Sequence, residues 1–411
     1  MATHTETAPI RAKQVRLPRT AAVWVMAGIL WAFFAAAAAP SPLFLVYRAE
    51  WNFPVWMLTL AFAIYAIALL GALLSFGRLS DHIGRRPVLL GALLLEGVAM
   101  TLFLTAGNVG IVILARIVQG IATGAATGAL SAAITDFAPP HRKTLAPLLS
   151  SVAPLSGLAV GAIAAGLATE GGHPIVVVFI VFDILFLVGL GAVALSPESV
   201  TPRPGAGRSL VPRVAIPVAA RAEFIREIPV SAAVWIVGGF YLAVVAEVLR
   251  EVLGVTSGAV EGFYIAGVSG FGALASFFAR NFSARVNAAY GSVLIAVGMP
   301  VVLLGMNTRS FVVIAIGTLL AGAGFGMGYL GGVGILAPLA KAHERGELFS
   351  GLYVVNYLAF GIPAIIAGLL IDAFGLLPTV NEYGILVVIA GLAGAALQLP
   401  RLFRYGHHSA R

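Results

Sequence analysis

Twelve long apolar runs, separated by short polar segments, constrain this chain of 411 residues more than any other feature. A helix needs roughly 20 apolar residues to cross a bilayer. The runs lack the alternation over roughly 10 residues that is typical of a membrane β-barrel strand. We therefore expect an all-α membrane protein with twelve transmembrane helices. The predicted spans are 21–47, 54–76, 87–106, 109–135, 145–168, 174–195, 230–252, 259–279, 287–306, 310–338, 348–371 and 383–400.

The composition agrees with this interpretation. Hydrophobic residues make up 60% of the chain and charged residues only 10%, whereas soluble domains average about 25% charged residues. A water-soluble fold of this length could not hide so much apolar surface. The chain has no cysteine, which excludes disulfides, thiolate metal sites and a cysteine nucleophile.

The net charge of +8 is unevenly distributed along the chain. Basic residues concentrate in the tails 1–20 and 401–411 and in alternate connecting segments, whereas Arg48, Arg250 and Arg309 lie in the others. Cytoplasmic segments of membrane proteins carry the excess of Lys and Arg. We expect both termini in the cytoplasm, a location in the plasma membrane (a bacterial inner membrane), and no nucleic-acid partner.

The chain divides into two similar halves. Residues 196–229 are rich in Pro, Gly and Arg, which predicts a cytoplasmic linker between bundles at 21–195 and 230–400. The hexapeptide AIAAGL at 162–167 returns as AIIAGL at 364–369, and Gly120 and Gly124 recur at the same offset as Gly322 and Gly326. Repeated halves around a mid-membrane site are a known plan of transporters.

The segment GRLSDHIGRR, between the second and third spans, is unusually polar for this chain. It resembles the signature loop of the major facilitator superfamily, G-x-L-x-D-x-x-G-[RK]-[RK]. The residues that match are Gly77, Leu79, Asp81, Gly84, Arg85 and Arg86. The twelve spans, the central linker and the Pro197–Glu198 pair after the sixth span extend the resemblance over nearly the whole chain.

The resemblance implies that this loop latches the two halves together. Asp81 would face the N-terminus of span eleven, and Arg85 would pair with Asp136 at the end of span four. The alternative is that the loop carries only positive-inside charge. The counterpart loop of the second half keeps Arg285 but has Arg280 where the acid would stand.

Span four contains the one Lys or Arg in the middle of a predicted span, Arg116. It forms a polar stripe with Gln119, Thr123 and Thr127 beside a glycine stripe that lets another helix approach closely. The stripe resembles the superfamily's R-x-x-Q-G motif, which implies a role in proton transfer. The alternative is a structural arginine bonded to the backbone of a broken neighbouring helix.

Span five resembles the exporter motif of drug/proton antiporters, G-x-x-x-G-P-x-x-G-G. Gly157, Gly161 and Gly166 match, whereas Ala162 and Ala165 depart from it. The resemblance favours export.

A coupled carrier needs a titratable group in or beside its cavity. The candidates are Glu96 in span three, Asp183 in span six and Glu247 in span seven. Glu96 and Asp183 could instead be paired acids within their own bundle, and Glu247 could form an i,i+3 pair with Arg250. We expect Glu261 to be solvated.

Aromatic, amide and hydroxyl side chains are the candidates for a substrate cavity, although packing is the alternative for each ring. They are Trp31, Phe34, Gln119, Thr123, Trp235, Phe240, Phe325, Tyr329, Tyr353, Asn356 and Tyr357.

We expect no cofactor, no metal and no enzyme activity. No Walker loop is present, and the pair His407 and His408 is too small for a structural metal site. The hypothesis is a monomeric secondary active transporter in the lipid bilayer that exports a small organic molecule against protons. A proton-coupled importer and a non-transporting receptor or scaffold are the alternatives.

Overall fold

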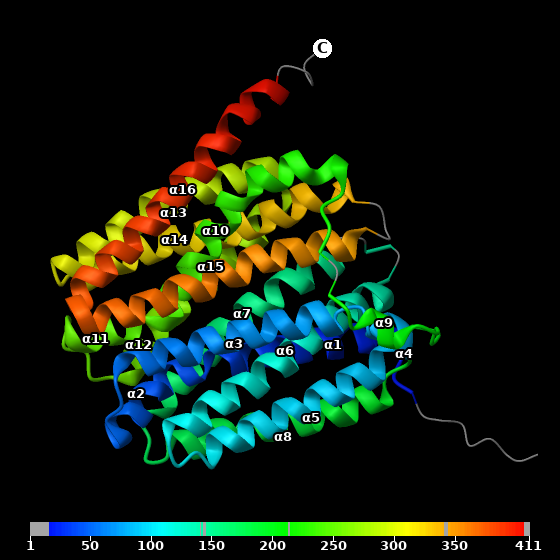
Figure 1. Cartoon of the computed structure of the whole chain (residues 1–411), viewed down its shortest axis with the longest axis horizontal. Coiled ribbons are helices and arrows are strands. Elements are labelled where there is room, and N and C mark those ends of the chain that lie inside the picture. Colours follow the sequence, from blue (N-terminus) through cyan, green and yellow to red (C-terminus); the bar gives the residue numbers. More distant parts are fainter. Residues whose placement is uncertain (1–15, 140, 143–144, 213, 341–343, 407–411) are drawn as a thin grey trace, which may run out of the picture.

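The computed structural model describes residues 16–139, 141–142, 145–212, 214–340 and 344–406. These residues form helices joined by short connections, with no strand among them (Figure 1). In this part of the chain twelve segments are long and apolar enough to cross a membrane, which confirms the predicted all-α membrane fold. Arg11 and Lys13 of the basic N-terminal tail and the pair His407 and His408 lie outside the described residues.

The helices of the first half are α1 (Arg19–Ala38), α2 (Pro40–Trp51), α3 (Val55–Phe76), α4 (Ser80–Ile83), α5 (Arg85–Leu104), α6 (Val109–Phe137), α7 (Leu145–Ala168) and α8 (Pro174–Leu195). The connection carries α9 (Ala206–Ser209) and the short 3-10 helix η1 (Val218–Ala220). The second half contains α10 (Arg221–Ala243), α11 (Val245–Glu251), α12 (Gly258–Phe278), η2 (Ala279–Asn281), α13 (Ala284–Asn307), α14 (Phe311–Leu336), η3 (Ala337–Leu339), α15 (Arg345–Phe374) and α16 (Leu376–Gly406).

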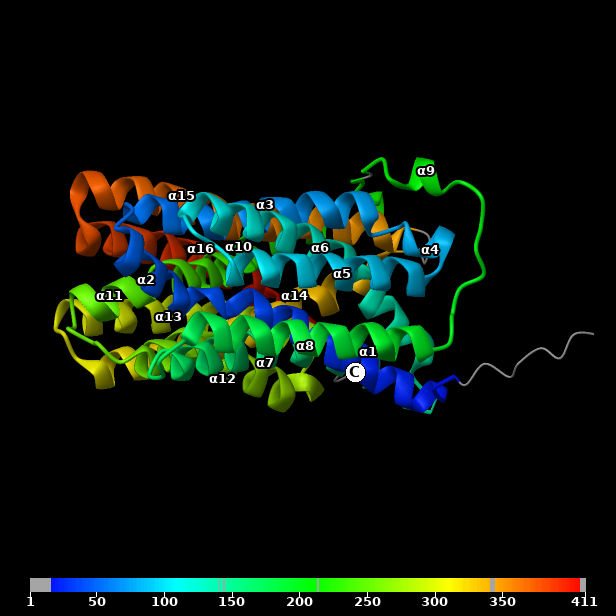
Figure 2. The same ribbon diagram turned by 90° about the horizontal axis from the view of Figure 1, so that it is seen from below.

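The two halves form two six-span bundles that lie side by side (Figure 1). The bundles meet mainly along α7 against α12 and α3 against α15. The connection with α9 runs past one end of the molecule, where α4 also lies, whereas α2 and α11 lie at the opposite end (Figure 2). We call these the α4 end and the α11 end.

The seventh span begins earlier than predicted and is broken near its end. Helix α10 starts at Arg221, inside the segment predicted as linker, and Val244, with φ −124°, separates it from α11. Polar residues made this stretch resemble a loop, but the structure pairs them across helices. The Glu223 carboxylate lies 3.2 Å from Arg285 Nη1, and Gln398 Nε2 donates to Glu227 Oε2 at 2.9 Å.

Two prolines break the first span. Pro40 and Pro42 stand in the first turn of α2, directly after α1 ends at Ala38. Because proline has no backbone N–H, Pro40 cannot donate to the carbonyl of Ala36, four residues earlier. A carbonyl left without its helical donor in a membrane interior needs another partner.

The repeated glycines make the same contact in both halves. Gly120 and Gly124 of α6 lie against α3, where a Cβ on Gly120 would come within 2.5 Å of the Tyr65 carbonyl oxygen. Gly322 and Gly326 of α14 lie against α12, where a Cβ on Gly322 would come within 2.9 Å of the Val268 carbonyl oxygen. The sequence repeat thus corresponds to a repeated close helix pair.

We predict that Gly124→Ala lowers the thermal stability of the purified protein, because the added Cβ would overlap the Leu69 carbonyl oxygen of α3. Overpacking of this kind costs about 1–3 kcal/mol. Thermal unfolding in detergent measures it. Gly91→Ala is the matched control, since a Cβ at Gly91 would meet nothing within 4 Å. Equal melting temperatures for the two variants would contradict the prediction.

Candidate functional site

Arg116 lies near the middle of α6 and is 1% exposed. Its guanidinium donates from Nη1 to the Ala37 carbonyl oxygen at 3.0 Å and to Gln119 Oε1 at 2.7 Å, and from Nε to the Ala61 carbonyl oxygen at 3.2 Å. These acceptors come from α1, α3 and α6 itself. The side chain therefore ties three helices of the first bundle together.

Three aromatic rings surround the same guanidinium. Its Cζ lies 4.5 Å from the ring centroid of Tyr65, 5.0 Å from that of Phe62 and 5.5 Å from that of Phe44. A cation over an aromatic face is stabilised by about 2 kcal/mol or more when desolvated. This offsets part of the about 2.5–3.5 kcal/mol that insertion scales assign to arginine at a span centre.

Gln119 connects Arg116 to a buried acid. Its Nε2 donates to the Ala36 carbonyl oxygen at 3.0 Å, the carbonyl that Pro40 leaves without a helical donor, and to Glu96 Oε1 at 3.2 Å. Glu96, on α5, is fully buried, and its Oε2 has no hydrogen-bond partner within the described residues. We call Arg116, Gln119 and Glu96 the polar network.

Thr123 and Thr127 lie on the same face of α6 but bond to their own helix. Their hydroxyl groups donate to the carbonyl oxygens of Gln119 and Thr123 at 2.9 and 2.7 Å. They extend the polar stripe without joining another helix through these bonds.

Between the bundles lies a cluster of rings from α10, α14 and α15, which we call the aromatic cluster. It consists of Trp235, Tyr329, Tyr353, Tyr357 and Phe360. The Trp235 ring centroid lies 5.0 Å from that of Tyr357 and 6.4 Å from that of Tyr329. Asn356, which is 2% exposed, accepts from Trp235 Nε1 at 3.0 Å when its amide oxygen faces α10.

Tyr65 of α3 joins the polar network to the aromatic cluster. It belongs to the same buried apolar group as Tyr357 and Phe360 of α15, across the boundary between the bundles. The face of Tyr65 meets the Arg116 guanidinium. A change at Arg116 or Glu96 can therefore reach the second bundle through one packed ring.

Four other predicted cavity residues lie at the edge of the aromatic cluster or away from it. Phe240 and Phe325 belong to the core of the second bundle, and the Phe240 ring packs at 5.4 Å from that of Tyr383. Trp31 and Phe34 are half-buried on α1, where Gly157 of α7 packs against their turn. Trp235 and Tyr329 pack against the buried group that contains Phe325, so Phe325 borders the aromatic cluster, whereas no ring contact joins Phe240, Trp31 or Phe34 to it among the described residues.

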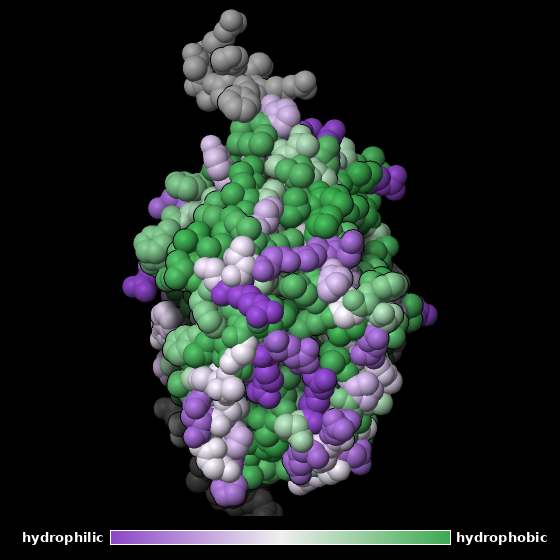
Figure 3. Space-filling model, turned by 90° about the vertical axis from the view of Figure 1, so that its left-hand side faces the viewer, coloured by the Kyte–Doolittle hydropathy of each residue, from purple (hydrophilic) through white to green (hydrophobic). Residues whose placement is uncertain are grey.

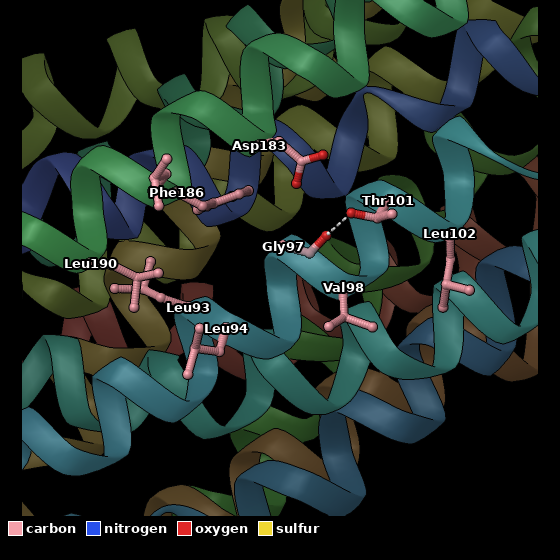
Figure 4. A pocket seen from close by; sticks show the side chains of 10 residues that line it. Leu93, Leu94, Gly97, Val98, Thr101, Leu102, Asp183, Phe186 and Leu190 are labelled. Carbon is pink, nitrogen blue, oxygen red and sulfur yellow. Dashed lines mark hydrogen bonds between the residues drawn. The ribbon is translucent and has the colours of Figure 1, made fainter.

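Asp183 lies outside the polar network, in a groove between α5 and α8 (Figure 4). A Cβ on Gly97 would lie 3.7 Å from Asp183 Oδ1. Among the described residues no cation lies within ion-pair distance of this carboxylate.

At the α4 end, Arg85 contacts polar side chains of the signature segment and of α6. Its Nη1 lies 2.5 Å from Asp81 Oδ1 and donates to Ser80 Oγ at 2.6 Å, and its Nε lies 3.4 Å from Asp136 Oδ2. Asp81 therefore pairs within the loop, whereas Arg78 Nη1 lies 3.7 Å from Glu347 Oε1 at the start of span eleven.

Glu198, noted in the sequence only as part of a Pro–Glu pair, caps α5. Its two carboxylate oxygens accept from the backbone N–H groups of Arg85 and Arg86, both at 2.9 Å. An acid at a helix N-terminus is favoured by the unpaired N–H groups and the helix dipole. Gly84, with φ +102°, turns the chain into this helix, whereas Gly77 keeps a helical φ of −56°.

At the α11 end, charged residues gather over the middle of the exposed face (Figure 3). Glu247 forms an ion pair with Arg48 of α2, across the bundles, and not the alternative i,i+3 pair with Arg250. Arg250 instead lies 3.2 Å from Glu261, which is 1% exposed, so the expectation that Glu261 is solvated is also wrong. Sequence spacing could not reveal partners that come from other helices.

The bundles are closely packed at this end. Gly166 of α7 lies against Gly258 and Gly262 of α12, and a Cβ on Gly262 would come within 2.6 Å of the Ala162 carbonyl oxygen. A cavity of about 20 Å³ remains between α2 and α11, lined in part by Ser41 and Glu247. This is roughly the size of one water, and together with the close packing of α7 on α12 it makes the α11 end the closed one.

Two bundles of six spans with a shared interface define a membrane transporter fold. The sequence profile of the Major Facilitator Superfamily matches residues 23–305, and the chain belongs to this family. A search of curated proteins gives no match.

Two solved structures show the same fold. The human organic anion transporter MFSD10 (TETRAN) is 17% identical, with 92% of this chain and all of that chain covered and a TM-score of 0.67. The D-xylose-proton symporter is 17% identical, with 92% of this chain and 96% of that chain covered and a TM-score of 0.70.

We predict that acid favours the closed α11 end. A hydrogen bond with Glu247, together with burial and the charge of Glu247, raises the pKa of Glu251 from 4.5 to about 7, against the effect of Arg48. A raised acid pKa means that the closed arrangement binds the proton more tightly than a separated one. The free-energy advantage of the closed arrangement is therefore full below pH 4.5 and is lost as the pH rises to about 7.

The absence of cysteine allows a direct measurement. Spin labels on cysteines introduced at Ala49 and Thr256, one on each bundle, should report longer distances at pH 8 than at pH 5. Glu251→Gln should remove this dependence, whereas Glu50→Gln, a nearby acid on α2, should keep it. A pH-independent distance in the unmodified background would refute the prediction.

Proposed function

We propose that this chain is a secondary active transporter that moves a small organic molecule by alternating access and couples the movement to protons. The observation that supports this most directly is the buried polar network and its link, through Tyr65, to the aromatic cluster between the bundles. Within this network Glu96 keeps a buried carboxylate oxygen without a hydrogen-bond partner among the described residues, which can take up a proton.

Glu96 is the proton site in this proposal. It lies beside the one buried arginine of the described spans, but Gln119 stands between them and bonds to both. Protonation of Glu96 removes a buried negative charge and leaves Arg116 with Gln119, the backbone carbonyls and the Tyr65 ring. Because that ring packs on α15, the change in charge alters the contact between the bundles.

The two ends alternate. Positive-inside charge assigns the α4 end to the cytoplasm, so the closed α11 end faces outside and the arrangement is the one shut to the exterior. Opening of the α11 end separates Arg48 from Glu247 and α7 from α12. Arg85, Asp81 and Asp136, with the Arg78–Glu347 pair, then hold the α4 end closed.

The substrate class follows from the aromatic cluster. Several rings with one buried amide, Asn356, suit a small amphipathic organic molecule better than an ion. Export is favoured by Gly157, Gly161 and Gly166, which match the exporter motif. Import by symport is the second candidate, because a D-xylose-proton symporter has the same fold. The transporter acts as a monomer, because each bundle pair encloses a complete site.

We predict that Glu96→Gln uncouples substrate movement from protons. The test reconstitutes the protein in liposomes and measures the flux of fluorescent organic cations and anions with and without a pH gradient. The unmodified protein should accelerate at least one probe when a gradient is imposed, and the sign of the effective gradient gives the direction. Glu96→Gln should keep probe exchange but lose the acceleration, because the variant cannot release a proton.

The control uses the pseudo-symmetric position in the second bundle. Tyr241 and Thr318 share a hydrogen bond of 2.7 Å there, and Tyr241→Phe should retain gradient-driven flux. Arg116→Ala should abolish flux altogether while the protein still inserts into the membrane. Gradient-driven flux that survives Glu96→Gln would exclude Glu96 as the proton site, and flux that survives Arg116→Ala would exclude the whole network.

A further inference from the structure

The groove between α5 and α8 lies on the outer side of the first bundle, away from the polar network and the aromatic cluster. It has a volume of about 470 Å³, and its lining is almost entirely aliphatic or aromatic. The two polar side chains of the lining are Asp183 from α8 and Thr101 from α5, which lie across the groove from each other (Figure 4).

The groove opens towards the bilayer. The surrounding side chains of Leu94, Leu187 and Ile184 are 58%, 68% and 56% exposed, as expected of helix faces in contact with lipid chains. Asp183 stands near the middle of α8, which spans Pro174–Leu195. Its carboxylate therefore lies near the centre of the hydrocarbon layer, where ionisable groups are rare and usually functional.

The carboxylate has no counter-ion of its own. Within the part of the chain described, no ion pair reaches Asp183. The Thr101 hydroxyl donates to the Gly97 carbonyl oxygen at 3.0 Å, and Gly97 contributes no side chain that could fill the space before Asp183. Glu96, the residue before Gly97 in the sequence, accepts instead from Gln119.

The occupant must bring both a cation and an apolar body. A second copy of this chain offers no such cation, because Arg116, the one mid-span Lys or Arg of the described residues, is 1% exposed. A phospholipid amine lies at the headgroup level, on the order of 15 Å from the bilayer centre. A small lipophilic amine dissolved in the hydrocarbon layer meets both requirements, and the groove volume is within the range of small-molecule pockets.

We propose that the groove between α5 and α8 is a membrane-facing binding site for lipophilic amines, in which Asp183 pairs with the ammonium group. The apolar body then lies along Leu93 and Leu190, and Thr101 offers a hydroxyl beside the cation. This site is independent of the transport proposal, because it uses no residue of the polar network or the aromatic cluster.

The test uses the full chain in nanodiscs and a dodecyldimethylamine that carries a photoreactive diazirine on its alkyl chain. Mass spectrometry should locate the label on peptides of α5 and α8 that line the groove. Unlabelled dodecyldimethylamine should compete, whereas dodecanol, with the same chain and no charge, should not. Asp183→Asn should weaken the labelling about tenfold, as expected for loss of a desolvated charge pair.

Two further variants keep the test decisive. Asp372→Asn removes an exposed acid elsewhere and should leave labelling unchanged. Gly97→Leu fills the groove without removing the acid, since a Cβ there would make an ordinary contact, and it should also abolish labelling even if Asp183→Asn fails to fold. Equal competition by dodecanol, unchanged labelling of Gly97→Leu, or protection by a second copy in the same nanodisc would overturn the proposal.

Discussion

The polar interior of the first bundle depends on one break in its first helix. Pro40 cannot donate to the Ala36 carbonyl, and Gln119 donates to it instead. Arg116 takes the neighbouring Ala37 carbonyl. In a membrane interior, unpaired backbone groups and unpaired cations are both costly. Here the backbone carbonyls of α1 accept hydrogen bonds from Arg116 and Gln119, so both costs are reduced. The stability of the arginine and the position of Glu96 beside it follow from this exchange.

The two pseudo-symmetric bundles differ in the polar residues at equivalent positions. The glycines that bring α6 onto α3 recur where α14 meets α12. At the position equivalent to Arg116, however, the second bundle has Thr318, bonded to Tyr241. The same backbone plan thus holds a charged network in one bundle and a neutral pair in the other. The charged network therefore lies in the first bundle, and the second bundle supplies most of the rings that face it.

The charged residues at the two ends of the molecule differ in which helices they connect. At the α4 end, most bonds of Arg85 and Glu198 stay within the first bundle and brace the turn at Gly84. At the α11 end, Arg48 and Glu247 bridge the bundles directly. The α11 end therefore carries the contacts that must break for the bundles to separate there.

The sequence by itself determined the twelve spans, the two halves, the signature segment and the importance of Arg116, because long apolar runs and a lone buried cation leave few alternatives in a membrane. Only the tertiary structure decided which acid meets which base. Glu247 pairs with Arg48, and Glu261 pairs with Arg250. Glu96 and Arg116 both form hydrogen bonds with Gln119. These partners lie on other helices, and the orientation of each helix about its own axis is set by packing, which spacing along one chain does not encode.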